Sequence, residues 1–260
     1  AIYADEFKHD KTKKQLIYKD AVLKIYDVPV LYFPKFFHPD PSVKRQSGLL
    51  QPEINSSNTL GSSLTLPYYK VISNNKDLTL NPTFFDGSMS MLTTEYRAIN
   101  QSSKILADVG FVNKYKSITT NKKNNLSHYF VDIDHNLNLE NYNSSDLKLS
   151  IRKVSMDTYL KIFDQQMTKS KLRPDDFDNL NSSIKLFLNN EDFNFESGIE
   201  SYEDLQIKNG SDRYQYNLPY YNYDRLISQN YFEGNISFGS NGNNYLSNTN
   251  KLETNITNNI

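Results

Sequence analysis

Oxygen-bearing side chains at every second position could bind a metal ion in this chain; they are Asp132, Asp134, Asn136, Asn138 and Glu140. Alternating oxygen ligands are typical of a calcium-binding loop. Such a loop requires glycine where this chain has Leu137, and a bidentate glutamate where it has Asn143. Val131 and Ile133 fill the intervening positions, and this strict alternation indicates one polar face of a β-strand. We therefore expect no calcium site here.

Other residues that could do chemistry are isolated from one another. The four histidines, at positions 9, 38, 128 and 135, lack the spacing of metal ligands, and no Gly-x-Ser-x-Gly motif or glycine-rich phosphate loop occurs. The chain has no cysteine, which excludes thiol catalysis, disulfides and cysteine-based zinc sites within it. We expect no enzymatic activity, no metal and no cofactor.

Composition limits the partners. The 260 residues include 29 basic and 30 acidic side chains, so the chain offers no basic surface suited to nucleic acid. Mean hydropathy is −0.66, and no run of about 18 apolar residues predicts a membrane-spanning helix. The first ten residues lack the charged and apolar regions of a signal peptide and read as the middle of a strand. We expect the sequence to be part of a longer protein.

A period of two predicts β-strands along most of the chain. After Gly48 we count about ten strands of roughly 8 to 12 residues, longer than the usual 5 to 6. In these strands Leu80, Leu92, Val131 and Leu149 are expected on the apolar face, and their neighbours Thr79, Thr93, Asp132 and Ser150 on the polar face. Such strands fit a soluble sandwich or a transmembrane barrel. Tyrosine pairs after Pro67 and Pro219 favour the barrel, because aromatic rings collect at membrane interfaces.

The N-terminal part has a different sequence pattern, with shorter strands and closely spaced prolines. Short alternating strands are expected at residues 13–19 and 21–28, as in a jelly roll or solenoid. Four prolines follow, at positions 34, 39, 41 and 52, and each removes a backbone donor. We therefore predict an N-terminal β domain over residues 1–33, a stiff hinge over 34–47 and a second β domain over 48–260.

The hinge carries a specific resemblance. The stretch VPVLYFPKFFHPDPSVKRQSGLL, residues 28–50, precedes LPYY at 66–69, KDLTLNP at 76–82 and EYR at 95–97. In order and spacing these motifs closely resemble the LptD (OstA) family of outer-membrane lipopolysaccharide-assembly proteins. Later stretches also match the family, beginning at Asp157, Leu180, Tyr202 and Leu218. The resemblance implies an all-β fold: the end of a periplasmic β-jelly-roll, followed by the first antiparallel strands of a large outer-membrane β-barrel.

The resemblance also implies a function, which is translocation of lipopolysaccharide from a periplasmic bridge through a lateral barrel seam to the outer leaflet. Leu16, Tyr18, Leu23 and Ile25 are then candidates to line a slot for acyl chains; alternatively they fill a small β core. Pro52 and Pro67 are candidates for the lateral gate, because proline weakens strand pairing. The alternative is that both lie at strand ends outside the paired region.

The hinge residues Pro34, Pro39 and Pro41 are expected to aim this slot at the membrane. Lys44 and Arg45 are expected at the periplasmic membrane boundary, where basic side chains can reach lipid phosphates; simple solvated charge is the alternative. The implied partners are lipopolysaccharide, a lipoprotein plug resembling LptE, a periplasmic bridge protein resembling LptA and the outer membrane itself.

A second hypothesis comes from another class. A soluble two-domain β protein, acting as a glycan-binding or adhesion module, would show the same alternation. Dependence on detergent separates the two, because a barrel exposes an apolar band that aggregates in plain buffer.

Overall fold

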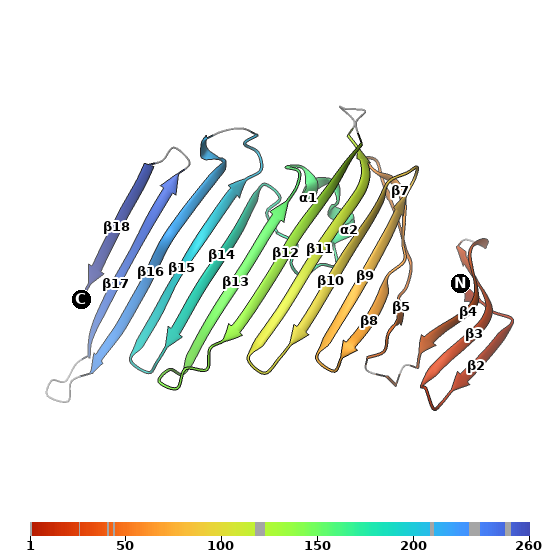
Figure 1. Ribbon diagram of the computed structural model, residues 1–260, viewed down its shortest axis with the longest axis horizontal. Helices are drawn as coiled ribbons and strands as arrows, with labels where there is room; N and C mark the ends of the chain where they lie inside the picture. Colours follow the sequence, from red (N-terminus) through yellow and green to blue (C-terminus); the bar gives the residue numbers. More distant parts are fainter. Residues whose placement is uncertain are drawn as a thin grey trace.

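Two antiparallel β-sheets make up nearly the whole chain, as the computed structural model shows (Figure 1), so the all-β prediction is confirmed. The structure describes all residues except 1, 26, 41, 44, 118–122, 209–210, 229–234 and 248–250. The two sheets are those expected for part of a jelly roll followed by barrel strands. None of the helices in the described residues is long and apolar enough to cross a membrane.

The N-terminal sheet contains β1 (Ile2–Tyr3), β2 (Glu6–Asp10), β3 (Gln15–Ile25) and β4 (Val28–Pro39). β3 is central and pairs with the other three strands. It is one strand where two were expected, and it bends at Asp20, which has a φ of 49°. β4 continues through Pro34 to Pro39, beyond the predicted boundary at residue 33. The ladder tolerates these prolines because β4 pairs only with β3, and an edge strand needs donors on one side only.

The second sheet is a 14-stranded antiparallel sheet. Its first strands are β5 (Gly48–Leu49), β6 (Glu53–Ser57), β7 (Gly61–Thr65), β8 (Tyr68–Ser73), β9 (Lys76–Phe85), β10 (Ser90–Ile99) and β11 (Ser103–Lys116). The remainder are β12 (Lys123–Asn136), β13 (Ser144–Val154), β14 (Asn179–Asn189), β15 (Phe193–Asp204), β16 (Tyr214–Ser228), β17 (Asn235–Ser247) and β18 (Lys251–Asn259). In this sheet β9 to β18 follow one another in chain order. At its other end β9 pairs with both β7 and β8, β7 pairs with β6, and β8 pairs with β5. Figure 1 shows this row of tilted strands, with the N-terminal sheet beside the β5–β8 end.

Two short helices interrupt the strands between β13 and β14. They are α1 (Tyr159–Ile162) and α2 (Asp164–Met167), and both lie over one face of the sheet (Figure 1). A further single turn, η1 (Ser211–Arg213), precedes β16. We call residues 155–178 the inserted segment. Its apolar side chains pack against strand residues to form the main hydrophobic cluster; they include Tyr159, Leu160, Phe163, Met167 and Leu172.

A buried histidine fixes the inserted segment to the sheet. His128 of β12 is fully buried, its Nδ1 lies 2.9 Å from the Tyr159 hydroxyl, and its Nε2 lies 3.3 Å from Asp108. Room for the imidazole ring comes from Gly110 on β11, where a Cβ atom would lie 2.3 Å from His128 Cε1. The glycine therefore allows the histidine to lie flat against the neighbouring strand.

The two faces of the large sheet differ in chemistry, and the face that carries most of the polar side chains is the more buried one. Phe84 is 54% exposed while its neighbour Thr83 is 3% exposed, and Leu92 is 40% exposed while Thr93 is 6% exposed. Asp108 and Glu200 are also buried on this polar face. We call it the inner face, since the inserted segment covers part of it, and the apolar side the outer face. Under the inserted segment the inner face is apolar and buried, with Phe85, Met91 and Phe130 in the hydrophobic cluster. The outer face leaves large apolar side chains exposed, which is unusual for a water-soluble sheet.

Candidate functional site

A small apolar pocket of about 60 Å³ lies at the junction of the two sheets. The N-terminal sheet contributes Leu23, Phe33 and Phe36 to its wall, and the large sheet and the segment leading into it contribute Leu49, Leu50, Pro52 and Leu66. Every side chain in this lining is apolar. The pocket is therefore suited to a hydrocarbon chain.

The N-terminal wall depends on the bend of β3. Tyr18 packs against Phe36 with ring centroids 5.8 Å apart, and Phe36 packs against Phe33 at 5.7 Å. Strict alternation would place residues 33 and 36 on opposite faces. β3 and β4 bend together near Asp20, whose φ is positive, so aromatic and aliphatic side chains from both sides of the bend gather on one face.

The four predicted lipid-binding residues are all on β3. Leu23 lines the pocket, and Tyr18 contacts its wall through Phe36. Leu16 is half-buried and pairs with His9 and His38 at the other end of the strand. Ile25 belongs to β3, but its side chain lies outside the described part of the chain. The structure thus brings two of the four to the pocket region, and their function as lipid contacts stays a prediction.

The opposite wall is formed where strand pairing is interrupted. Leu49 of β5 pairs with Tyr68 of β8, and Glu53 of β6 pairs with Thr65 of β7. Between these pairs, the three residues 50–52 lie opposite the two residues 66–67. Pro67 is one of those two, and neither it nor Pro52 has a backbone N–H to donate. One bond crosses the break, from the Leu50 nitrogen to the Pro67 carbonyl oxygen at 2.8 Å.

Pro52 and Pro67 lie on opposite faces of this break. Pro52 lines the apolar pocket, whereas Pro67 lines a polar cavity on the inner face together with Glu53, Glu95 and Lys169 of the inserted segment. Leu50 borders both spaces. The break is therefore a thin partition between an apolar compartment and a polar one.

The connector between the two sheets, residues 40–47, is held by several polar contacts. Asp40 accepts a hydrogen bond from the Ser42 nitrogen at 2.8 Å, and its other carboxylate oxygen lies 2.6 Å from His9 Nε2. Arg45 binds Asp77 of β9 at 2.5 Å. Of the remaining predicted hinge residues, Pro34 and Pro39 belong to β4, and Pro41 and Lys44 lie outside the described residues.

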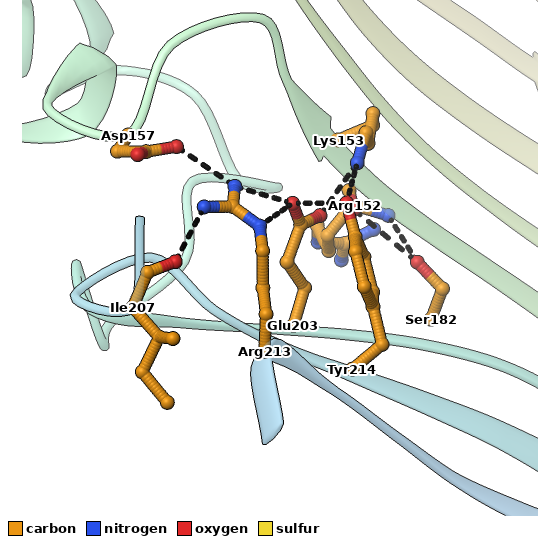
Figure 2. A network of polar contacts seen from close by, with 8 residues as sticks. All are labelled: Arg152, Lys153, Asp157, Ser182, Glu203, Ile207, Arg213 and Tyr214. Atoms are coloured by element: carbon orange, nitrogen blue, oxygen red, sulfur yellow. Dashed lines mark hydrogen bonds and ion pairs between the residues drawn. The ribbon is translucent and has the colours of Figure 1, made fainter. Parts of the chain in front are cut away.

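A second polar network lies where the inserted segment leaves β13, and we call it the rim network (Figure 2). Register pairing between β13 and β14 ends at Ser150 and Ser183, after which the inserted segment leaves the sheet. Beyond this point, buried Glu203 accepts hydrogen bonds from Lys153 at 2.6 Å and from Arg213 at 2.7 Å. Arg213 also reaches Asp157 at 2.7 Å. The network therefore joins the start of the inserted segment to β15 and β16.

Asp132, one of the residues first considered as metal ligands, forms an ion pair instead. Asp132 is bound by Arg152, with Nη1 at 2.8 Å and Nη2 at 3.0 Å from its two oxygens. Within the described ranges, no three or more histidine or acidic side chains are grouped so that they could hold a metal ion.

Several site residues were absent from the sequence-based set. Phe33 and Phe36 form the aromatic wall of the pocket, yet strict alternation separates them. Leu66 directly precedes Pro67, and Leu49 lies three residues before Pro52; an apolar residue close to a proline is the signal that could have identified them. Asp77 gave no signal of its own.

Comparison with known proteins shows similarity to one group. The chain is 37% identical over 114 residues to the LPS-assembly protein LptD of Pseudoalteromonas translucida, an alignment covering 44% of the chain and 15% of that protein. It is 32% identical over 143 residues to LptD of Idiomarina loihiensis, covering 55% and 18%, and 30% identical over 155 residues to LptD of Cupriavidus necator, covering 59% and 18%. The alignments therefore span less than a fifth of the length of these relatives. No family model matches the chain.

Proposed function

We propose that this chain, which is a segment of the LptD family, takes part in lipopolysaccharide assembly by passing acyl chains from its N-terminal sheet to the outer face of its first barrel strands. The observation that carries this proposal is the junction pocket. Its lining combines three side chains of the N-terminal sheet with four from the start of the large sheet. Burying acyl chains in such a pocket is favourable by about 0.8 kcal/mol per methylene group.

The position of the pocket supports lateral delivery. Pro52 and Leu66 line it and belong to the face that elsewhere presents Phe84, Leu92 and other exposed apolar side chains. An acyl chain that leaves the pocket along this face stays in contact with apolar surface. The interrupted pairing at Leu50 and Pro67 would let the polar saccharide cross on the inner side, which makes Pro52 and Pro67 the gate.

The proposed location is the outer membrane, with the N-terminal sheet in the periplasm. In a membrane, the exposed apolar outer face would contact lipid and the polar inner face would contact water. The proposed partners are a lipoprotein plug resembling LptE on the polar inner side and a bridge protein resembling LptA that extends the N-terminal sheet. A soluble adhesion module is disfavoured by the exposed apolar side chains of the outer face, which include Phe84 and Leu92.

The assembly function is tested by placing a charge in the pocket. Full-length protein carrying Phe36→Asp, expressed while the native copy is depleted, should fold but deliver less lipopolysaccharide to the cell surface. Phe37→Asp is the matched control, because Phe37 is the exposed neighbour of Phe36 on the same strand. Normal surface lipopolysaccharide in the folded Phe36→Asp variant would refute the proposal.

A further inference from the structure

The guanidinium group of Arg45 contacts three separate parts of the β8–β9 hairpin. Its Nε donates to the Tyr69 hydroxyl at 3.1 Å, its Nη2 donates to Asp77 Oδ2 at 2.5 Å, and its Nη1 donates to the carbonyl oxygen of Asn74. An arginine side chain has five donors in a fixed plane and can hold several acceptors at once. The connector is therefore attached to the hairpin at three points by one side chain.

Asp77 is a rigid acceptor for this contact. It is buried, and its other oxygen accepts a hydrogen bond from Arg97 Nε of β10 at 2.6 Å. The Tyr69 hydroxyl donates to the oxygen that also binds Arg45, at 3.1 Å. Tyr69 and Arg97 thus hold Asp77 in place within the large sheet without help from Arg45. Arg45, which belongs to the connector, is the partner that can be released.

The rest of the connector is attached on both sides of Arg45. At its start, the Asp40 nitrogen donates to the Lys14 carbonyl oxygen of the N-terminal sheet at 2.9 Å. At its end, the Ser47 hydroxyl accepts a hydrogen bond from the Val71 nitrogen of β8 at 2.8 Å. The junction pocket lies between these attachments, so its two walls keep their alignment only while the connector stays docked.

We propose that Arg45 and Asp77 form an anchor that sets the angle between the N-terminal sheet and the barrel strands and thereby keeps the junction pocket continuous. Arg45 is a positioning residue in this account: it contacts the hairpin and does not contact the lipid. The consequence for lipid transfer rests on the proposed function; the anchor itself does not. Three of the five N–H donors of Arg45 are engaged by protein acceptors, and its predicted contact with lipid phosphate stays a prediction.

The test measures geometry and lipid contact separately in the full-length protein. Spin labels at Lys8 in the N-terminal sheet and Glu140 in a turn of the large sheet, both exposed, report the distance distribution between the sheets. A photoreactive residue at Leu50 reports crosslinking to lipopolysaccharide. The variants are Arg45→Ala and Arg45→Lys, and the control is Lys35→Ala, since Lys35 is an exposed β4 lysine without an ion pair to any described residue.

We expect a narrow distance distribution in the native protein and in Lys35→Ala, and a broad one in Arg45→Ala. Losing hydrogen bonds to a carboxylate should shift the docked-to-released ratio by about tenfold. Arg45→Lys should be intermediate, because an ammonium group cannot reach all three acceptors. An unchanged narrow distribution in Arg45→Ala would overturn the anchor. A broad distribution in Arg45→Ala, without crosslinking even in the native protein, would support the anchor and refute the lipid pathway instead.

Discussion

The backbone nitrogen of Leu50 lies 2.8 Å from the carbonyl oxygen of Pro67, and this single bond crosses the break between the first two strands of the large sheet. Leu50 borders the apolar pocket on one side and the polar cavity on the other. Separation of the two strands at this point would join the two compartments. The strength of pairing here should therefore control passage of an amphipathic ligand.

Replacing both prolines tests this directly. Pro52→Ala with Pro67→Ala restores two backbone donors, and each new ladder bond would stabilise the closed break by about 0.5 to 1.5 kcal/mol. We expect the full-length variant to fold normally, as judged by heat-modifiable gel mobility, but to deliver lipopolysaccharide more slowly. Normal delivery would show that the prolines do not form a gate.

The assignment of faces predicts a difference between two adjacent residues of β9. Leu80→Arg puts a charge on the outer face and should cost about 2 to 4 kcal/mol near the bilayer midplane. Thr79→Arg points the same group into the polar cavity that Thr79 lines and should cost about 1 kcal/mol or less. Unfolding from phospholipid vesicles by denaturant measures both. Equal costs would contradict the assignment of an outer, lipid-facing side.

Alternation of apolar and polar residues was enough to predict the antiparallel strands and their two faces, because a strand exposes successive side chains to opposite sides. It could not predict the bend at Asp20, because the positive φ of this residue departs from the extended strand conformation that alternation assumes. Phe33 and Phe36 therefore came together unforeseen. The helices α1 and α2 are four residues each, too short for a helical period to stand out, although Tyr159, Phe163 and Met167 repeat every fourth residue.

Long-range polar contacts were the other features that the sequence did not predict. Arg45 and Asp77 are 32 residues apart, and nothing in either local stretch indicates that a hairpin brings them together. Both residues lie in stretches that resemble the LptD family, but the resemblance does not relate one stretch to the other. In the structure Arg45 and Asp77 meet in one ion-pair cluster, which also includes Arg97 of residues 95–97.

The buried contact between Tyr159 and His128 should hold the inserted segment inside the sheet. Tyr159→Ala removes a fully buried ring, a change that typically costs about 3 to 5 kcal/mol. We expect the segment to detach, so that trypsin cleaves full-length folded protein rapidly after Lys169 or Lys171. Thr158→Ala alters an exposed neighbour and should leave cleavage slow. Equally slow cleavage in Tyr159→Ala would mean that the ring does not hold the segment.

The rim network should stabilise the start of the inserted segment. Arg213→Ala leaves buried Glu203 with fewer donors and removes the bond to Asp157, for which we expect a local loss of about 1 to 3 kcal/mol. Hydrogen exchange of residues 155–160, at the start of the inserted segment, should accelerate accordingly. Lys251→Ala breaks an exposed ion pair with Glu253, which contributes little to stability, and serves as the control. The network is unimportant if both variants exchange alike.

The most direct test of the proposed pathway is crosslinking of lipid in the pocket. A photoreactive phenylalanine analogue is placed at Phe36, which lines the pocket, or at its exposed neighbour Phe37, in full-length protein in living cells. Illumination should yield a lipopolysaccharide adduct at Phe36 and little or none at Phe37. Absence of an adduct at Phe36, or equal adducts at both positions, would contradict passage of acyl chains through the junction pocket.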